Sequence, residues 1–499
     1  MYLGIDLGTS EVKLLLLDDG GRIVGTAGSA LSLSAPQPLW SEQNPTDWWR
    51  ATGEAVSTLR AAHPAAFAAV RAIGLSGQMH GAVLLGADDA VLRPAILWND
   101  GRSHAQCDAL TTAAPRLHDI AGNLAMPGFT APKLLWVRQH EPEVFARLQT
   151  VLLPKDWLRL QLSGDKVSDP SDAAGTLWLD VARRDWSDEL LAACGLTRAN
   201  MPRLVESSQP GGLLKPELAR AWGLGPEVVV AGGAGDNAAS AIGIGATAPG
   251  DGFISLGTSG VLFVVNDRYR PNPASAVHAF CHALPQRWHQ MSVMLSAASC
   301  LRWFCTLVGA DEATLLAELA ASPSLSPSLS PSFSQNDSAV NEADAPLFLP
   351  YLAGERTPHN DPFAPGVFHG LKARTTRADC SYAVLEGVAF GLADGLDALR
   401  AAGTQVSQLS LVGGGSRSPF WAQLIADALD VEIVVHTGSE AGGALGAARL
   451  GWLAAGGDVD AVCTRPDIAA RFSSDPERHA RLAPRLARFR DLYRRLRGA

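Results

Sequence analysis

"IDLGTSEV" (residues 5–12) recurs about half a chain later as "ISLGTSGV" (residues 254–261), with six of the eight positions identical. Both copies are flanked by apolar, strand-like sequence. A Gly-Thr-Ser turn between two such runs predicts a strand–turn–strand hairpin. Coincidence in a chain rich in Gly and Leu is the alternative explanation. The repeat favours two related domains that each open with the same hairpin.

The sequence around the repeat predicts a mixed α/β fold. Strand-like runs surround a turn at residues 18–21, helical spacing covers Trp48–Leu59 and Pro64–Val70, and "AIGLSGQ" reads as a buried strand. Pro and Gly in Ala246–Gly252 indicate a boundary. We therefore predict one domain at residues 1–245 and another at residues 246–499.

A low-complexity stretch, "SPSLSPSLSPSFSQNDS" (residues 322–338), interrupts the second predicted domain. Its repeated prolines are incompatible with a regular helix or a central strand. We interpret it as a mobile surface insertion without chemistry. A modified or partner-binding loop is the alternative.

Charge and composition limit the partners. The net charge of −9 argues against nucleic acid or an anionic membrane as the main partner. The start of the chain resembles no signal peptide, and we see no bilayer-spanning apolar run, so we expect a cytoplasmic protein. The seven cysteines include no C-x-x-C pair, which favours reduced thiols. A homodimer is an option that the sequence leaves open.

The segment from His278 to His282 contains a Cys and two His residues, but their spacing matches no standard zinc pattern. Strand packing explains these residues better than a metal site does.

The two Gly-Thr-Ser turns are candidates for phosphate binding. Tight turns of this composition offer backbone N–H groups and hydroxyls to phosphate oxygens. A pair of them could hold one polyphosphate from both sides of a cleft. The residues concerned are Gly8, Thr9 and Ser10 in the first copy and Gly257, Thr258 and Ser259 in the second.

Two charged residues distinguish the first copy from the second. Asp6 and Lys13 stand where the second copy has Ser255 and Leu262. A carboxylate beside a phosphate turn would hold Mg²⁺, usually through water. Lys13 could neutralise phosphate charge, although an outward-facing strand lysine is an equally good interpretation.

A third glycine cluster lies in "LSLVGGGSRSPFWAQLIADAL" (residues 409–429). A strand at Leu409–Val412, a loop and a helix beginning at Pro419 together predict a nucleotide-sized concavity. Neither a G-x-G-x-x-G fingerprint nor a Walker A loop is present. The expected ATP-binding loop residues are Gly413, Gly414, Gly415 and Ser416.

Polar and aromatic residues at two strand ends are typical of polyol recognition. Gln78, Met79 and His80 lie between two glycines, and "ILWNDGRS" brings Trp98, Asp100 and Arg102. Sugar hydroxyls need paired donors and acceptors, and an apolar sugar face needs a flat surface. A hydrogen-bonded structural histidine is the alternative for His80.

Asp236 is the single ionisable residue in "AGGAGDNAASAIGIG" (residues 231–245). It follows a strand-like run and precedes a helix of small residues. Asp is common as a helix N-cap, which gives one interpretation. The other is a general base that the helix dipole keeps ionised. We expect it to lack a second carboxylate nearby, since that would raise its pKa.

These motifs resemble the actin/hexokinase/Hsp70 ATPase superfamily and, within it, the FGGY carbohydrate kinases. "GFTAPKLLWVRQH" (residues 128–140) matches one family signature, and "GVFHGLKARTTRADCSYAVLEG" (residues 366–387) matches another except at Cys380. The resemblance implies two actin-like, ribonuclease H-like domains, with mixed sheets flanked by helices and a cleft between them. It also implies ATP and Mg²⁺ as the cofactors.

Three further segments resemble the family members that phosphorylate D-xylulose to D-xylulose 5-phosphate: "WSEQNPTDWW" (residues 40–49), "GQMHG" (residues 77–81) and "ILWNDGR" (residues 96–102). By this resemblance Met79 and His80 contact the sugar, Asp236 is the catalytic base with Asn237 beside it, and Asp6 supports Mg–ATP. Ribulose, gluconate or a related polyol is the nearest alternative substrate. A non-kinase ATPase of the same superfamily is a more distant one.

Overall fold

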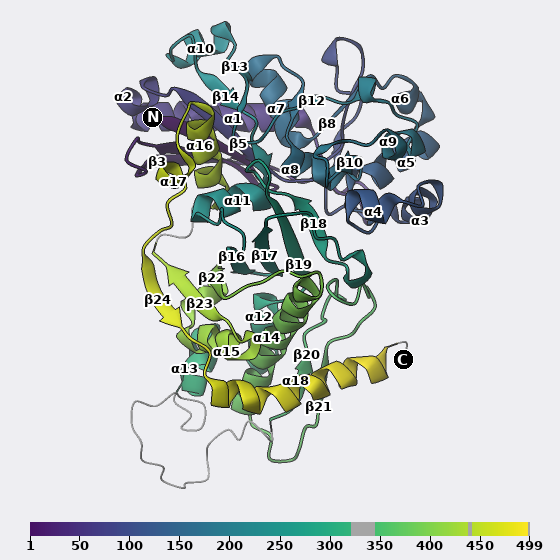
Figure 1. Cartoon of the computed structure of the whole chain (residues 1–499), viewed down its shortest axis with the longest axis vertical. Helices are drawn as coiled ribbons and strands as arrows, with labels where there is room; N and C mark the ends of the chain where they lie inside the picture. The colour runs from purple at the N-terminus through teal and green to yellow at the C-terminus, as the bar shows by residue number, and fades with distance from the viewer. Residues whose placement is uncertain (321–344, 438–441, 498–499) are drawn as a thin grey trace.

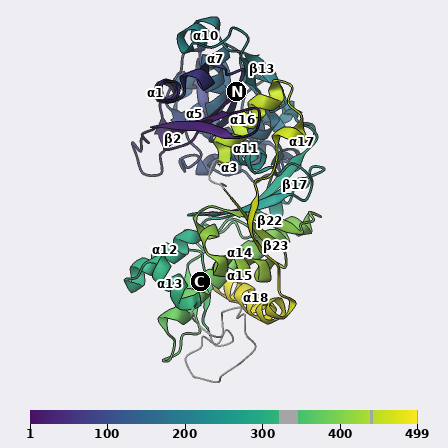
Figure 2. The same ribbon diagram turned by 90° about the vertical axis from the view of Figure 1, so that its left-hand side faces the viewer.

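The computed structural model describes residues 1–320, 345–437 and 442–497, so the predicted insertion at residues 322–338 lies outside the described residues. The chain forms two lobes stacked along its long axis (Figures 1 and 2). In the described residues each lobe is built on a seven-stranded sheet.

The sheet of the first lobe has the strand order β13-β14-β5-β1-β2-β3, with β15 beside β5. The central strand β1 is antiparallel to β2 and parallel to β5. The strands are β1 (Tyr2–Leu7), β2 (Glu11–Leu17), β3 (Ile23–Ala30), β5 (Ala72–Gly77), β13 (Pro210–Leu213), β14 (Val229–Ala231) and β15 (Ala234–Gly235).

The sheet of the second lobe repeats this plan in the order β18-β19-β17-β16-β22-β23-β24. Its central strand β16 is antiparallel to β17 and parallel to β22, as β1 is to β2 and β5. The predicted pair of ribonuclease H-like domains is therefore confirmed. The strands are β16 (Gly252–Leu256), β17 (Gly260–Asn266), β18 (His278–Cys281), β19 (Trp288–Met294), β22 (Gln408–Val412), β23 (Glu432–His436) and β24 (Ile468–Phe472).

Helices and short strand pairs surround both sheets. The helices up to the domain crossing are α1 (Pro45–Ala62), α2 (Pro64–Ala68), α3 (His104–Ala113), α4 (Leu117–Ala121), α5 (Thr130–His140), α6 (Pro142–Ala146), α7 (Pro154–Ser163), α8 (Pro170–Ala173), α9 (Asp188–Ala193), α10 (Pro216–Trp222) and α11 (Asp236–Ile244). Those after it are α12 (Ala298–Val308), α13 (Glu312–Ala320), α14 (Arg377–Ala401), α15 (Pro419–Leu429), α16 (Gly442–Ala454), α17 (Val459–Val462) and α18 (Pro476–Leu496).

The short strands are β4 (Glu42–Gln43), β6 (Val83–Leu85), β7 (Ala95–Ile96), β8 (Thr150–Leu152), β9 (Val167–Ser168), β10 (Leu179–Asp180), β11 (Asp185–Trp186), β12 (Arg203–Leu204), β20 (Leu347–Leu349) and β21 (Val367–His369). The predicted triple-glycine loop folds into a 3₁₀ turn at Gly414–Arg417. No helix among the described residues is long and apolar enough to cross a membrane.

Helix α1 covers one face of the first sheet. Asn44 caps it, because its side chain accepts the N–H of Thr46 at 3.1 Å. Trp48, Ala55 and other apolar residues of α1 then pack against alternate residues of β1 and β2. The predicted helix at residues 48–59 lies inside these bounds.

The opposite face of the first sheet is covered by α16, which comes from the second half of the sequence (Figure 1). Glycines permit the close approach of this helix. A Cβ added at Gly4 would lie 2.1 Å from the Ala444 carbonyl oxygen, and one added at Gly74 would lie 1.7 Å from that of Ala447. Small residues therefore let the helix backbone lie directly on two strands.

Helix α16 also crosses α11, and a third close contact fixes the crossing. A Cβ at Gly446 would lie 1.7 Å from the Ala239 carbonyl oxygen. The buried Arg449 guanidinium of α16 donates to the carbonyls of Ile242 and Gly243 at the end of α11, at 2.9 and 3.0 Å. Helix α11, from the first half of the sequence, and α16, from the second half, are thus packed backbone against backbone.

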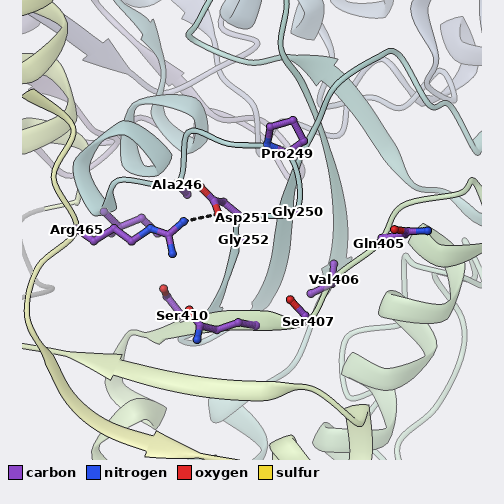
Figure 3. A pocket seen from close by; sticks show the side chains of 12 residues that line it. Ala246, Pro249, Gly250, Asp251, Gly252, Gln405, Val406, Ser407, Ser410 and Arg465 are labelled. Atoms are coloured by element: carbon purple, nitrogen blue, oxygen red, sulfur yellow. Dashed lines mark hydrogen bonds and ion pairs between the residues drawn. The ribbon is translucent and has the colours of Figure 1, made fainter. Parts of the chain in front are cut away.

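A cavity of about 590 Å³ lies beside the linker that follows α11 (Figure 3). The Asp251 and Arg465 side chains form an ion pair on its wall, and this pair joins the linker to the segment that returns to β24. The cavity therefore marks the region where the chain passes between the lobes.

We expect Gly446→Ala to lower the melting temperature by several degrees, because the added methyl group must push α11 and α16 apart. Gly53→Ala in α1 is the matched control, since a Cβ there has nothing within 4 Å. This control should gain up to about 1 kcal/mol from helix propensity. Equal melting temperatures for the two variants, measured by circular dichroism, would contradict the tight crossing.

Candidate functional site

Asp6 lies at the carboxyl end of β1, where the first sheet meets α16. Its Oδ1 accepts a hydrogen bond of 2.8 Å from the hydroxyl of Ser76, which lies at the end of β5. Lys13 is the partner of Asp6 in the register of β1 and β2. Gly443 in the first turn of α16 passes so close that a Cβ there would lie 2.8 Å from Asp6 Oδ2. Lys13 and Asp6 are cross-strand neighbours on the same face of the sheet.

Asp236 is the first residue of α11, directly after β15. Its Oδ1 accepts the Asn237 N–H at 2.7 Å and the Asn237 side-chain amide at 3.0 Å. Among the described residues no donor reaches Oδ2. The N-cap of α11 is Gly235 and no side-chain cap hydrogen bond is formed, so the interpretation of Asp236 as an N-cap was wrong. Its Oδ2 is available as a proton acceptor.

The electrostatics of Asp236 differ from the sequence-based expectation. Burial, and then the negative charge of Asp6, raise the pKa of Asp236 to about 6. Burial also raises the pKa of Asp6. The expectation of a lone carboxylate was wrong because Asp6, far away in the sequence, arrives from the end of β1.

Met79 and His80 form the centre of the predicted sugar site. A Cβ at Gly235 would lie 2.8 Å from Met79 Cγ, so the Met79 side chain packs against the residue before Asp236. His80 Nδ1 lies 2.7 Å from the Gly175 carbonyl oxygen, and its ring packs on Phe129 at 4.6 Å between centroids. Burial lowers the pKa of His80 to about 3, so this imidazole is a neutral hydrogen-bonding group at pH 7.

His80 adopts a left-handed backbone conformation with φ of 70°. This is uncommon for a residue with a Cβ. The side chains of Thr130 and Lys133, both in α5, donate to its carbonyl oxygen at 3.1 and 2.9 Å. The first family signature therefore holds the backbone of His80 in place.

Gln78 and Trp98 meet at Thr9. The Thr9 hydroxyl donates to Gln78 Oε1 at 3.0 Å and accepts the Trp98 indole N–H at 3.0 Å. Gln43 completes the group, since its side-chain amide donates to the Thr9 carbonyl at 2.7 Å. Gln43 was missed by the sequence analysis, although "WSEQNPTDWW" contained it.

Asp100 and Arg102 lie next to this group but face each other. Their buried side chains pair at 2.6 Å, and Arg102 also pairs with Glu42 at 2.7 Å and lies 3.5 Å above the Trp40 ring. Asp100 also accepts the Ser41 N–H. This arrangement supports the segment that carries Trp98, and direct sugar contact by Asp100 or Arg102 stays a prediction.

A cavity of about 670 Å³ opens between α11 and the second sheet. Gly413, Gly414 and Ser416 line it as predicted, whereas a Cβ at Gly415 would meet the Leu256 side chain at 2.4 Å. Among the described residues the cavity is lined by Asn237, Ser240, Ile244, Phe253, Ser255, Val261, Val412, Gly413, Gly414, Ser416, Arg417, Val435, His436 and Gly442. Its size and glycine-rich wall suit a nucleotide.

Each Gly-Thr-Ser turn joins the two strands of the central hairpin in its sheet, as predicted. The first turn joins β1 to β2, and the second joins β16 to β17. The Gly8 N–H donates to Glu11 within the first turn at 3.0 Å, and the Gly257 N–H donates to Ser259 in the second at 3.1 Å. Those two amides are therefore used by the turns themselves. Phosphate binding by Thr9, Ser10, Thr258 and Ser259 stays a prediction.

A buried ionic network, not foreseen from the sequence, supports the Asp236 loop. Lys155 Nζ lies 2.6 Å from Asp156 and 2.8 Å from Asp169, with all three side chains fully buried. Asp169 accepts the Ser171 hydroxyl, and the Ser171 oxygen accepts the Gly235 N–H at 3.2 Å. Buried networks of this kind hold backbone positions rigidly when their members are paired.

The short segment after Ser171 links this network to the sugar site. Gly175, whose carbonyl oxygen contacts His80, lies in the 3₁₀ turn Ala174–Thr176 that follows α8. One buried network thus positions both the residue before Asp236 and the partner of His80.

The segment from His278 to His282, whose Cys and two His residues suggested a metal site, forms strand β18 and the residue after it. His278 Nδ1 lies 3.0 Å from Asn123 Oδ1, and His282 Nε2 lies 3.2 Å from the Ala246 carbonyl oxygen. These contacts join the second sheet to the first lobe, which agrees with the strand-packing interpretation.

Comparison with known proteins agrees with this geometry. Residues 1–243 match the N-terminal domain, and residues 252–455 the C-terminal domain, of the FGGY family of carbohydrate kinases. The chain is 50% identical over 498 residues to the xylulose kinase of Escherichia coli and 48% identical over 499 residues to that of Klebsiella pneumoniae, covering 99% of each pair.

Solved structures show the same architecture. A structure described as a xyloylose kinase from Brucella ovis superposes with a TM-score of 0.93 at 50% identity, covering 100% of this chain and 99% of that one. The xylulose kinase of Rhodospirillum rubrum superposes at 0.88 with 28% identity and 99% coverage of both chains.

Two ribonuclease H-like domains around a nucleotide-sized cavity define an ATP-dependent enzyme of the actin-like class. The chain belongs to the FGGY family of carbohydrate kinases.

We expect Asp236→Asn to raise the melting temperature at pH 7.5. The folded-state pKa of about 6 lies above the usual 3.8, so the ionised carboxylate disfavours the fold. By linkage, the destabilisation caused by the ionised Asp236 is complete above about pH 6 and decreases between pH 6 and 3.8. Below pH 3.8 it is absent, because the carboxyl group is then protonated in both the folded and the unfolded state. The difference in melting temperature between Asp236→Asn and wild type should therefore decrease toward pH 4.

Asp267→Asn is the matched control, because its exposed carboxylate has a lowered pKa and stabilises the fold when ionised. A melting temperature of Asp236→Asn no higher than wild type at pH 7.5 would contradict the raised pKa of Asp236, whose first cause is burial and whose second is the Asp6 charge.

Proposed function

We propose that the protein transfers the γ-phosphoryl group of ATP to D-xylulose and releases D-xylulose 5-phosphate and ADP. The observation that carries the proposal is the position of Asp236. Met79 of the predicted sugar site packs against Gly235, directly before Asp236, and Asn237, directly after it, lines the cavity of about 670 Å³. Relatives with about half of their residues identical over nearly the whole chain are named xylulose kinases, which supports the choice of sugar.

Asp236 acts as the general base in this proposal. A sugar hydroxyl is a weak nucleophile, and a carboxylate within hydrogen-bond reach accepts its proton as the new O–P bond forms. The bond from the γ-phosphorus to the bridging oxygen of ADP breaks, and ADP leaves with that electron pair. Oδ2 is the accepting atom, because Oδ1 is already bonded to Asn237.

The nucleotide would lie in the 670 Å³ cavity with its adenosine against Gly413 and Gly414. Its phosphates would extend past Asn237 toward the ends of β1 and β16. Lys13 lies at that edge in register with Asp6, where an ammonium neutralises phosphate charge. Closure of the two lobes would limit transfer of the phosphoryl group to water.

The residues present fit a magnesium ion. No group of three or more His, Cys, Asp or Glu side chains in the described part of the chain could hold a metal by itself. Mg²⁺ typically takes one or two carboxylates and completes its shell with water and substrate phosphates. Ser76 bonds only Oδ1 of Asp6, so Asp6 Oδ2 would supply such a ligand. The bound ion would neutralise charge on the phosphates. A cytoplasmic location and a homodimer stay predictions.

The pH dependence of catalysis tests the base. Because Asp236 must be ionised, kcat/KM for D-xylulose should fall about tenfold per pH unit below an apparent pKa near 6. Asp236→Ala should lose nearly all phosphoryl transfer while binding ATP and remaining folded. Near-normal kcat in Asp236→Ala would overturn the assignment.

Asp6→Asn provides a second readout. Removing the neighbouring negative charge lowers the pKa of Asp236, so the acid limb of its residual activity should move to lower pH. An acid limb at the same pH as in wild type would show that Asp6 does not raise the pKa of Asp236.

A substrate panel at fixed ATP tests the sugar. We expect D-xylulose to give the highest kcat/KM among D-xylulose, D-ribulose, gluconate and glycerol, measured by coupled ADP release. A much higher value for another sugar would reassign the substrate within the family. ATP turnover that is equal with and without sugar would instead favour a non-kinase ATPase.

A further inference from the structure

The segment that leads into Asp236, residues 231–235, consists only of Ala and Gly. Glycine imposes few restrictions on φ and ψ, so hydrogen bonds have to fix the path of this segment. The buried guanidinium of Arg159 in α7 donates to two of its carbonyl oxygens. The Gly233 N–H donates to the Ser207 carbonyl at 3.0 Å. These bonds fix the segment as far as Gly233.

The end of this segment depends on one side chain. The Gly235 N–H donates to Ser171 Oγ at 3.2 Å, and the Ser171 side chain is fully buried. Gly235 is the N-cap of α11, so this bond holds the residue from which the helix and Asp236 start. Among the described residues no other side chain accepts a backbone N–H of residues 231–235. The position of Asp236 relative to α8 therefore depends on the Ser171 hydroxyl.

A buried carboxyl group fixes the orientation of the Ser171 hydroxyl. Asp169 Oδ2 accepts this hydroxyl, and it also accepts the Ser171 N–H at 2.8 Å and the Ser207 hydroxyl at 2.6 Å. The other oxygen of Asp169 lies 2.8 Å from Lys155 Nζ. A serine hydroxyl has one proton to donate and can also accept. Because that proton goes to Asp169, the Ser171 oxygen is an acceptor of fixed orientation for the Gly235 N–H.

The Lys155 network is anchored to the predicted sugar site. Helix α7, whose second residue is Lys155, packs on the two glycines that flank the predicted sugar residues. A Cβ added at Gly77 would lie 3.0 Å from Lys155 Cβ, and one added at Gly81 would lie 2.5 Å from Pro154 Cγ. The start of α7 therefore has a fixed position relative to this site, and Ser171 connects it to the start of α11.

The contact between this segment and His80 is independent of the Ser171 hydroxyl. The Gly175 carbonyl oxygen lies 2.7 Å from His80 Nδ1, in the turn that follows α8. Helix α8 is capped by Asp169 through the Ser171 N–H, a backbone group that every residue except Pro provides. Removing the hydroxyl alone should therefore release Gly235 and leave Gly175 in place.

We propose that Ser171 is a positioning residue for the general base: its hydroxyl, oriented by Asp169, ties the start of α11 to the sugar site and so sets the distance from Asp236 Oδ2 to the reacting sugar hydroxyl. Ser171 acts through Gly235 and Asp236 and does not contact the substrate itself. A misplacement of about 1 Å can lower a reaction rate by about 100-fold. The inference rests on the proposed function, in which Asp236 is the base.

Ser171→Ala tests the inference, because it removes the hydroxyl and adds no atoms. We expect kcat for D-xylulose to fall by about 10- to 100-fold, the scale of a small misplacement of a reacting group. The KM values for D-xylulose and ATP should stay within about twofold, because Gly175 and the nucleotide cavity keep their contacts. Coupled ADP release measures both constants. An unchanged kcat, or a raised KM for D-xylulose without a fall in kcat, would overturn the inference.

Ser187→Ala is the matched control. Ser187 is also buried in the first lobe, and its hydroxyl accepts a backbone N–H, that of Leu190 at the start of α9, at 3.4 Å. Each variant loses one hydrogen bond to a backbone amide, so both should lower the melting temperature to a similar extent. Only Ser171→Ala should lower kcat. Equal falls in kcat for the two variants would attribute the effect to lost stability and overturn the inference.

A double-mutant cycle separates positioning of the base from a general structural role. Residues that act as a unit are not additive, so adding Ser171→Ala to Asp236→Ala should lower the residual phosphoryl transfer by less than about twofold. Single-turnover transfer from γ-labelled ATP with excess enzyme measures this residual rate. A further loss as large as in the wild-type background would overturn the inference and leave the proposed function intact. Near-normal kcat in Asp236→Ala would instead overturn the base assignment.

Discussion

The crossing of α11 and α16 is the constraint on which the site depends. Each helix begins at the junction of the lobes, and their backbones touch where Gly446 meets the Ala239 carbonyl. The start of α16 lies over Asp6 and the start of α11 carries Asp236, so one packing contact sets the relation of both carboxylates. The small residues are thus a condition of the chemistry as well as of the packing.

This arrangement brings two negative charges together inside the protein, which opposes folding. Burial and mutual repulsion raise the pKa of Asp236 to about 6, still low enough for the carboxylate to be ionised near pH 7. A base with a pKa slightly below the working pH combines the correct protonation state with a useful proton affinity. The buried Lys155 network fixes the backbone before Asp236 and so resists displacement by this repulsion.

Much of the fold was predictable, because the repeated hairpins carry strong local signals. These signals come from residues that are close in the sequence. They include the repeat of Ile5–Val12 at Ile254–Val261, the strand at Leu409–Val412 and the helix that starts at Pro419. The packing of α16 on the first sheet was not predictable, since its contacts with Gly4 and Gly74 join opposite ends of the chain. The insertion at residues 322–338 falls outside the described residues.

The candidate site was predictable to a similar degree. Residues in compact motifs could be located from the sequence: Met79 packs beside Gly235, and Gly413 lines the cavity of about 670 Å³. Their binding of sugar and nucleotide stays a prediction. Contacts over long sequence distances were missed, such as the Asp6 charge beside Asp236 and the pairing of Arg102 with Glu42. Charge interactions depend on three-dimensional distance, which a linear pattern does not encode.

The measurement that tests the central claim most directly is a crystal structure with D-xylulose and a non-hydrolysable ATP analogue. The account predicts the C5 hydroxyl within about 2.6–3.2 Å of Asp236 Oδ2 and in line with the γ-phosphorus. A C5 hydroxyl bonded elsewhere, with Asp236 outside hydrogen-bond reach of the sugar in the closed complex, would contradict it.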